Sequence, residues 1–160
     1  KGFGGVMQTF DNTRPIVAAM ALGVARASLE VTETFLKEAG VDTRMRGSRW
    51  TQHAAAAELH RMKAELEAAR LLTIKAAWMA DNGIPNSVEA SMAKAKAGRT
   101  ANEVTLRCVE LCGGTGYGET ELLEKWARDS KILDIFEGTQ QIQLLIIARR
   151  VLGLTSAQLK

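Results

Sequence analysis

One apolar stripe restricts what this chain can fold into. Between residues 54 and 80, apolar or small side chains recur at alternating intervals of four and three: Ala55, Leu59, Met62, Leu66, Ala69, Thr73, Ala76 and Ala80. This spacing places them on one face of an α-helix. At about 1.5 Å per residue the helix would be about 40 Å long, which favours a bundle over a compact globin-like fold.

Helix signals also lie before this segment. Pro15 predicts the start of an earlier helix, since proline is favoured in the first turn, and Thr13 is a candidate cap residue. Gly40 predicts the end of that helix. We expect a loop at about residues 40–49 to connect it to the next one.

Further helix signals follow it. Asn86, with Glu89 three residues later, forms a candidate capping box for a third helix. We expect that helix to run to about Cys112 and to stop at the glycine pair that follows. Shorter helices are expected at about residues 120–129 and 139–152.

Length and composition are those of one domain. The chain has 160 residues, of which 46% are hydrophobic and 24% charged. With the helix signals, they predict an all-α fold, an antiparallel up-and-down helical bundle in which residues 1–160 form a single domain. The chain begins at Lys1 rather than at a methionine, and no signal segment follows. We therefore expect it to be the C-terminal part of a longer protein.

Charge and hydropathy argue against two kinds of partner, nucleic acid and a membrane. The net charge of +3 comes from interleaved basic and acidic residues, so we expect no nucleic-acid binding. The densest basic stretch contains Arg44, Arg46 and Arg49 and is either a solvated loop or a phosphate contact. No uninterrupted apolar run reaches the roughly 18 residues of a membrane span, so no membrane insertion is expected.

The cysteines indicate a reducing compartment. Cys108 and Cys112 lie four residues apart, on one face of a helix, and we expect both to be buried thiols. They do not supply the four ligands of a structural zinc site, so no metal site is expected. A cytoplasmic location follows as the expectation.

Two features point to chemistry. Residues 113–118 include four glycines but follow a helix and lack the Gly-Lys-Ser/Thr ending, so they form neither a P-loop nor a dinucleotide fingerprint. Either they end a helix or they allow a ligand or a neighbouring subunit to approach the backbone. Glu137, beside Ile135 and Phe136, is either a helix-capping acid or a poorly solvated carboxylate suited to general-base work.

Three motifs decide between these interpretations. They are Phe10–Pro15, Cys112–Tyr117 with the charged segment Glu124–Ile132, and Phe136–Gln143 with Ala148-Arg149. In this order they resemble the C-terminal domain of the acyl-CoA dehydrogenase family, over nearly the whole chain from about Phe10 to Gly153.

The resemblance implies a three-domain flavoenzyme of fatty acid β-oxidation that uses FAD. It would form trans-2-enoyl-CoA from an acyl-CoA thioester. Glu137 would remove the α-proton while the β-hydrogen leaves as hydride to the flavin. The Glu137 N–H and a flavin hydroxyl would polarise the thioester carbonyl. Because the other two domains supply most flavin and thioester contacts, we expect the 160-residue chain alone to be inactive.

The resemblance also assigns binding roles. It implies substrate contacts at Asp11, Arg14, Gly138 and Arg149. It implies cofactor contacts at Gly113, Gly114, Thr139 and Gln141, with Arg44 and His53 as further candidates. Alternatives remain open for three of these: a surface salt bridge for Arg14, a helix C-terminus for Arg149 and a surface histidine for His53.

The implied partners are an acyl-CoA thioester, an electron-transferring flavoprotein as acceptor, and further copies of the chain in a homodimer or homotetramer. Two other functions remain open. One is an acyl-CoA oxidase-like homologue. The other is a non-catalytic or heteromeric helical subunit with an incomplete flavin site, which Glu110 favours because its carboxylate would repel a flavin pyrophosphate unless paired.

Overall fold

The computed structural model describes residues 2–48, 50–155 and 157–158, apart from the side chains of residues 3, 4 and 7. The described residues form five helices and no strand: α1 (Gly2–Glu38), α2 (Ala54–Asp81), α3 (Ser87–Tyr117), α4 (Leu123–Ile135) and α5 (Gln140–Leu152).

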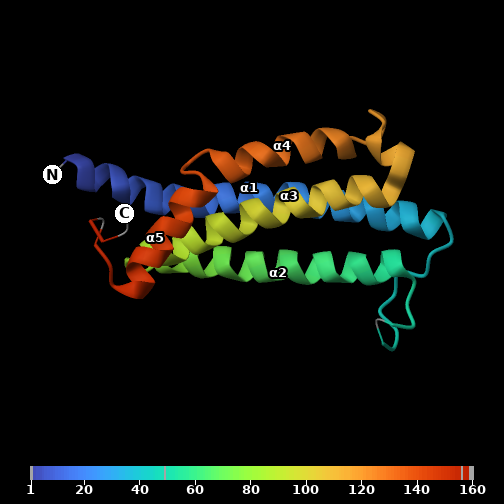
Figure 1. Cartoon of the computed structure of the whole chain (residues 1–160), viewed down its shortest axis with the longest axis horizontal. Helices are drawn as coiled ribbons and strands as arrows, with labels where there is room; N and C mark the ends of the chain where they lie inside the picture. Colours follow the sequence, from blue (N-terminus) through green and yellow to red (C-terminus); the bar gives the residue numbers. More distant parts are fainter. Residues whose placement is uncertain (1, 49, 156, 159–160) are drawn as a thin grey trace.

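The first four helices run alternately in opposite directions, and α5 lies at the end of the bundle where α3 begins (Figure 1). The central helix is α3, which packs against each of the other four. Small residues make its close packing possible, because Ala90, Ala93, Ala97 and Ala101 have no exposed surface. The predicted all-α, up-and-down bundle is confirmed.

Helix α1 begins much earlier than the sequence predicted. Pro15 lies inside it rather than in its first turn. Proline lacks the N–H that would reach the carbonyl of Asp11, so one helical hydrogen bond is missing there. An ion pair of 2.5 Å between Arg14 and Asp11 spans the same turn. The prediction of a helix start near Pro15, capped by Thr13, was therefore wrong.

The predicted helix over residues 54–80 is confirmed by α2, but the capping box proposed for α3 is wrong. Asn86 is buried and makes no side-chain cap. Its Nδ2 donates instead to the carbonyl of Ala76, 2.9 Å away in α2. Glu89 forms an ion pair with Lys75 of α2, at 3.5 Å. Both side chains therefore join two helices rather than close the start of one.

The glycine-rich segment bends α3 but does not end it. Only Gly113 leaves helical geometry, with φ 55° and ψ −132°, and the helix continues to Tyr117. A side chain at Gly116 would lie 2.7 Å from the Val109 carbonyl oxygen, so that position requires glycine for close packing. The expected stop at Gly113-Gly114 is thus a kink.

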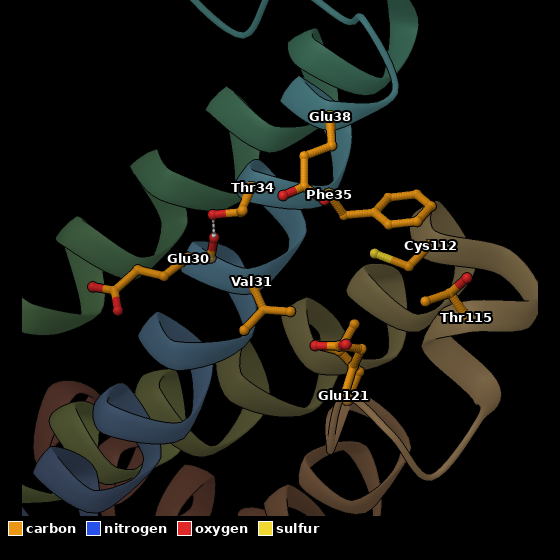
Figure 2. Close-up of a pocket in the computed structure, with 9 residues that line it drawn as sticks. Glu30, Val31, Thr34, Phe35, Glu38, Cys112, Thr115 and Glu121 are labelled. Atoms are coloured by element: carbon orange, nitrogen blue, oxygen red, sulfur yellow. Dashed lines mark hydrogen bonds between the residues drawn. The ribbon is translucent and has the colours of Figure 1, made fainter.

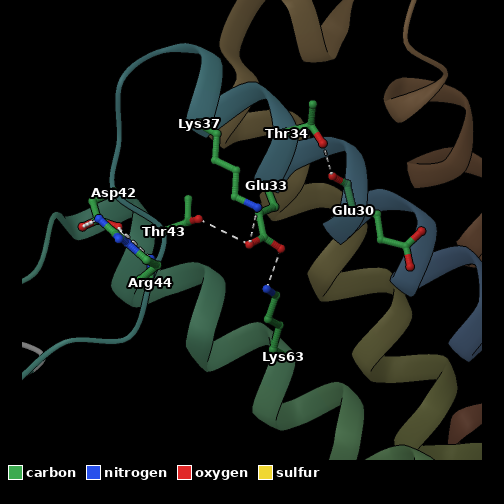
Figure 3. Close-up of polar contacts among 8 residues, drawn as sticks. All are labelled: Glu30, Glu33, Thr34, Lys37, Asp42, Thr43, Arg44 and Lys63. Carbon is green, nitrogen blue, oxygen red and sulfur yellow. Dashed lines mark hydrogen bonds and ion pairs between the residues drawn. The ribbon is translucent and has the colours of Figure 1, made fainter.

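A polar network joins α1 to α2 (Figure 3). The Glu33 carboxylate accepts hydrogen bonds from Lys63 of α2 at 2.6 Å and from Thr43 at 3.3 Å, and it pairs with Lys37 at 3.0 Å. These partners, Lys63 above all, lower the pKa of Glu33 from 4.5 to about 2. The carboxylate therefore stays ionised and holds the loop after α1 against α2.

The expectation that no segment is apolar enough to cross a membrane was wrong for α1. Residues Gln8–Glu38 pass that test by length and composition. Within α1, Ala21, Ala25 and Leu29 are almost completely buried in the core. Core helices pass the same test, and packing accounts for the buried face of α1, while Ile16 and Met20 on the same helix are exposed.

Candidate active site

Glu137 lies in the short connection between α4 and α5, in a backbone conformation that residues other than glycine rarely adopt. Its φ is 57°, and the following Gly138 has φ 93°. A left-handed residue other than glycine costs about 1–2 kcal/mol, so the surrounding structure must hold it there. The connection ends at Thr139, whose side chain caps α5 by accepting a hydrogen bond from the Ile142 N–H.

The Glu137 carboxylate reaches back to the first helix. Thr13, 124 residues earlier, donates its hydroxyl hydrogen to Glu137 Oε2 over 2.8 Å. Among the described residues, neither Glu137 Oε1 nor the Glu137 N–H has a hydrogen-bond partner. One carboxylate oxygen is thus oriented, while the other oxygen and a backbone donor of the same residue are available.

The carbonyl groups of Glu137 and Gly138 are bound by side chains of α3 and α5. Lys94 of α3 donates to the Gly138 oxygen over 2.8 Å. Gln143 of α5 donates to the oxygens of Glu137 and Gly138, over 3.0 and 3.1 Å. Both side chains are completely buried, and burial lowers the pKa of Lys94.

Asp11 and Arg14 lie in the same turn of α1 as Thr13. The salt bridge considered for Arg14 is present, with Asp11, but the Arg14 side chain is only 3% exposed, so the expected surface position of this pair was wrong. Its guanidinium also lies 6.0 Å from the centre of the Phe10 ring. Arg14 Nε is buried without a hydrogen-bond partner in the described part of the chain. A buried charge therefore lies beside the residue that holds Glu137.

The remaining residues expected near Glu137 are on α5. Gln141 is exposed in its first turn, and Arg149 lies in its last turn, half-buried. Arg149 Nε has no partner among the described residues. The position in the last turn suits a cation, so the helix-terminus role considered for Arg149 is compatible with the structure.

The other four candidate residues lie at the opposite end of the bundle (Figure 1): Gly113, Gly114, Arg44 and His53. Along α3, the 19 residues from Lys94 to Gly113 span about 28 Å at about 1.5 Å per residue. Gly114 adjoins Gly113, and the loop before α2 holds Arg44 and His53. Arg44 is exposed and pairs with Asp42 (Figure 3), and the His53 Nδ1 caps α2.

A pocket of about 550 Å³ lies beside the glycine pair (Figure 2). Cys112 and Thr115, which precede and follow the glycine pair in α3, line the pocket, and Phe35 of α1 faces them. Three carboxylates, of Glu30, Glu38 and Glu121, also line it. Their charge opposes a phosphate group, so we do not assign a cofactor phosphate to this pocket.

Comparison with known proteins identifies the family. The family model described as acyl-CoA dehydrogenase, C-terminal domain, matches residues 1–152. The chain belongs to the acyl-CoA dehydrogenase family.

Similar proteins include two acyl-CoA dehydrogenases. The chain is 35% identical over 155 residues to the short-chain specific acyl-CoA dehydrogenase of Clostridium acetobutylicum, covering 94% of this chain and 39% of that protein. The structure of butyryl-CoA dehydrogenase from Megasphaera elsdenii aligns with a TM-score of 0.84 and 37% identity, over 95% of this chain and 39% of the other.

A third similar chain occurs in a structure described as the electron transferring flavoprotein of Acidaminococcus fermentans. It aligns with a TM-score of 0.82 and 36% identity, over 92% of this chain and 38% of the other. The chain therefore spans about two fifths of the length of these relatives.

Both glycines of the pair face open space outside the chain. A Cβ added at Gly113 or Gly114 would meet no atom within 4 Å, so neither lacks a side chain because of internal crowding. The backbone of Gly113 explains its own glycine, since φ is positive there. Nothing within the described residues explains Gly114, and both glycines are exposed.

Sequence reasoning did not identify three residues of the site as functional: Thr13, Lys94 and Gln143. For Lys94 the sequence does contain a signal: its spacing places it on the helical face formed by Ala90, Ala97 and Ala101, and this apolar face predicts burial. No comparable sequence signal marks the contact between Thr13 and Glu137, which depends on how α1 packs against the connection.

Proposed function

We propose that this chain is the C-terminal domain of an FAD-dependent acyl-CoA dehydrogenase, in which Glu137 removes the α-proton of an acyl-CoA thioester. One observation carries the proposal. The Glu137 carboxylate and the unpartnered Glu137 N–H come from the same left-handed residue, held by Thr13, Lys94 and Gln143. A base and a carbonyl-binding donor are therefore available together.

The residues of the chain divide the work as follows. Glu137 Oε1 takes the α-proton, while Thr13 keeps Oε2 oriented. The Glu137 N–H donates to the thioester oxygen and stabilises the negative charge that develops there. FAD, when bound, supplies the acceptor for the β-hydride. Arg14 and Asp11 support the segment of α1 that carries Thr13.

The partners follow from family membership and from the division of the candidate residues. We propose acyl-CoA as substrate, in fatty acid β-oxidation, and an electron-transferring flavoprotein as acceptor, which the similarity to a chain in the Acidaminococcus structure supports. Gly113 and Gly114 lie too far from Glu137 to contact the same flavin, which supports a homodimer or homotetramer with shared sites.

The non-catalytic subunit is less well supported than the enzyme. Its main support was the charge of Glu110, but this carboxylate pairs with Arg107, which also pairs with Glu58. The paired charge repels a pyrophosphate less than an isolated one. We also propose a cytoplasmic location, because Cys108 and Cys112 are free, buried thiols.

Anaerobic mixing of the full-length flavoprotein with a panel of acyl-CoAs tests the proposal. Flavin absorbance should bleach with the wild type. Glu137→Gln should still bind acyl-CoA but bleach at least about 100-fold more slowly. Glu119→Gln, in the exposed turn before α4, is the matched control and should behave as wild type. Normal bleaching in Glu137→Gln, or purification of the wild type without flavin, would refute the proposal.

A further inference from the structure

Lys94 is the largest side chain without any exposed surface in the described part of the chain. Its neighbours along the same face of α3 are alanines, and burial of an ammonium group is unfavourable unless it is well compensated. Its hydrogen bond goes to a main-chain carbonyl, that of Gly138, rather than to a carboxylate. The buried ammonium group of Lys94 therefore binds the backbone next to Glu137.

Gln143 completes the arrangement from another helix. The Gly138 oxygen accepts from both Lys94 and Gln143, so each of its two lone pairs has a donor. The Glu137 oxygen accepts from Gln143 as well. Consecutive carbonyl groups are thus held on one side by donors of α3 and α5.

The same contacts depend on the glycine. A Cβ on Gly138 would lie 2.5 Å from Gln143 Nε2, so the amide can approach only because that Cβ is absent. Holding these two carbonyls restricts rotation of the peptide groups on either side of Gly138, which has φ 93° and follows Glu137 with φ 57°. These angles set the direction of the Glu137 side chain toward Thr13 and leave the Glu137 N–H free.

We propose that Lys94 and Gln143 form a carbonyl clamp that positions the Glu137 carboxylate and N–H for catalysis. Lys94 is then a positioning residue, which does not touch the substrate. This inference rests on the proposed function of Glu137. The charged groups that act on Lys94 are Asp134 and Glu137, which favour its charged form, and Arg14, which opposes it.

The experiment compares Lys94→Met and Gln143→Met with the control Lys96→Met in the full-length flavoprotein. Methionine matches the length of glutamine, is one atom shorter than lysine, and removes the donor. Lys96 lies on the same helix but pairs with Glu65 of α2, away from Glu137. Two measurements are made on each protein: deuterium exchange of a peptide covering residues 136–140, and kcat and KM with an acyl-CoA substrate.

The clamp predicts faster exchange over residues 136–140, by about tenfold or more, in both donor variants. It also predicts a fall in kcat of about 100-fold with KM changed by less than about twofold, since both displaced groups, the carboxylate and the N–H, act mainly on the transition state. Lys96→Met should match the wild type in both. Lys94→Arg, which retains a donor, should recover part of kcat.

The proposal fails if exchange over residues 136–140 and kcat per bound flavin stay at wild-type values in either donor variant. If Lys94→Met does not fold, Gln143→Met decides the question, because it leaves no charge unpaired. If the wild type oxidises no acyl-CoA at all, the proposed function fails, and the clamp is judged by exchange alone.

Discussion

Replacement of Gly138 by alanine tests how tightly the connection at Glu137 is packed. Gly138 and Gly40 both have positive φ, 93° and 81°. A Cβ on Gly40 would meet nothing within 4 Å, whereas on Gly138 it would lie 2.5 Å from Gln143 Nε2. Gly40→Ala therefore measures the backbone cost alone, about 1–2 kcal/mol. It also cancels the effect of alanine on the unfolded chain.

Gly138→Ala adds the cost of displacing Gln143. Overpacking contributes about 1–3 kcal/mol, and each weakened hydrogen bond about 0.5–1.5 kcal/mol. We expect Gly138→Ala to lose about 3 kcal/mol more of the free energy of unfolding than Gly40→Ala. For a chain of this size that difference corresponds to a Tm lower by about 6–12 °C.

Circular dichroism during thermal unfolding measures both variants of the 160-residue chain beside the wild type. A double variant, Gly138→Ala with Gln143→Ala, should recover part of the loss, because the crowding atom is removed. Equal Tm values for Gly40→Ala and Gly138→Ala, within about 1 °C, would refute the reasoning.

Three further predictions concern other parts of the bundle. The pKa of Glu33, lowered to about 2 in the fold, lies below its unfolded value of 4.5, so this carboxylate stabilises the fold above about pH 4.5 and ceases to as pH falls toward 2. Glu33→Gln should therefore lower Tm at pH 7 and flatten its fall in acid, measured by thermal unfolding at each pH. Burial raises the pKa of Cys108 to about 11, so Ellman's reagent should modify Cys108 and Cys112 rapidly only in denaturant. Asn86→Ser should lower the free energy of unfolding in urea by about 1–2 kcal/mol, because serine caps helices well but cannot reach the Ala76 carbonyl; unchanged stability would restore the capping interpretation.

The sequence predicted the helices that depend on local pattern. The stripe of α2 is a property of spacing alone, and α2 ends within a residue of the predicted position. The start of α1 was missed because Pro15 is a strong local signal for a first turn. The helix nevertheless extends back to Gly2, although the described side chains before Asp11 are exposed. The sequence predicted a helix end at Gly113, where the helix only bends. The effect of a single glycine on a helix depends on its tertiary neighbours, which the sequence does not show.

The site shows the same limit at the level of side chains. Glu137 could be singled out from its apolar neighbours and its motif, and the structure adds the contact with Thr13. Sequence could not supply that contact, because 124 residues separate the two side chains. Gly138 was assigned to substrate binding by resemblance, and the structure shows that it also admits the amide of Gln143.

The central position of α3 connects these observations. Near its start, α3 provides Lys94 to the connection that carries Glu137, and about 28 Å further on it bends at Gly113. The stretch between them is rigid, packed helix whose alanines touch the core. Two features at opposite ends of one rigid helix cannot serve one compact ligand. If both serve the proposed flavin chemistry, each must face a different copy of the cofactor. A second copy of the chain is the simplest source of the flavin that the glycine pair would meet.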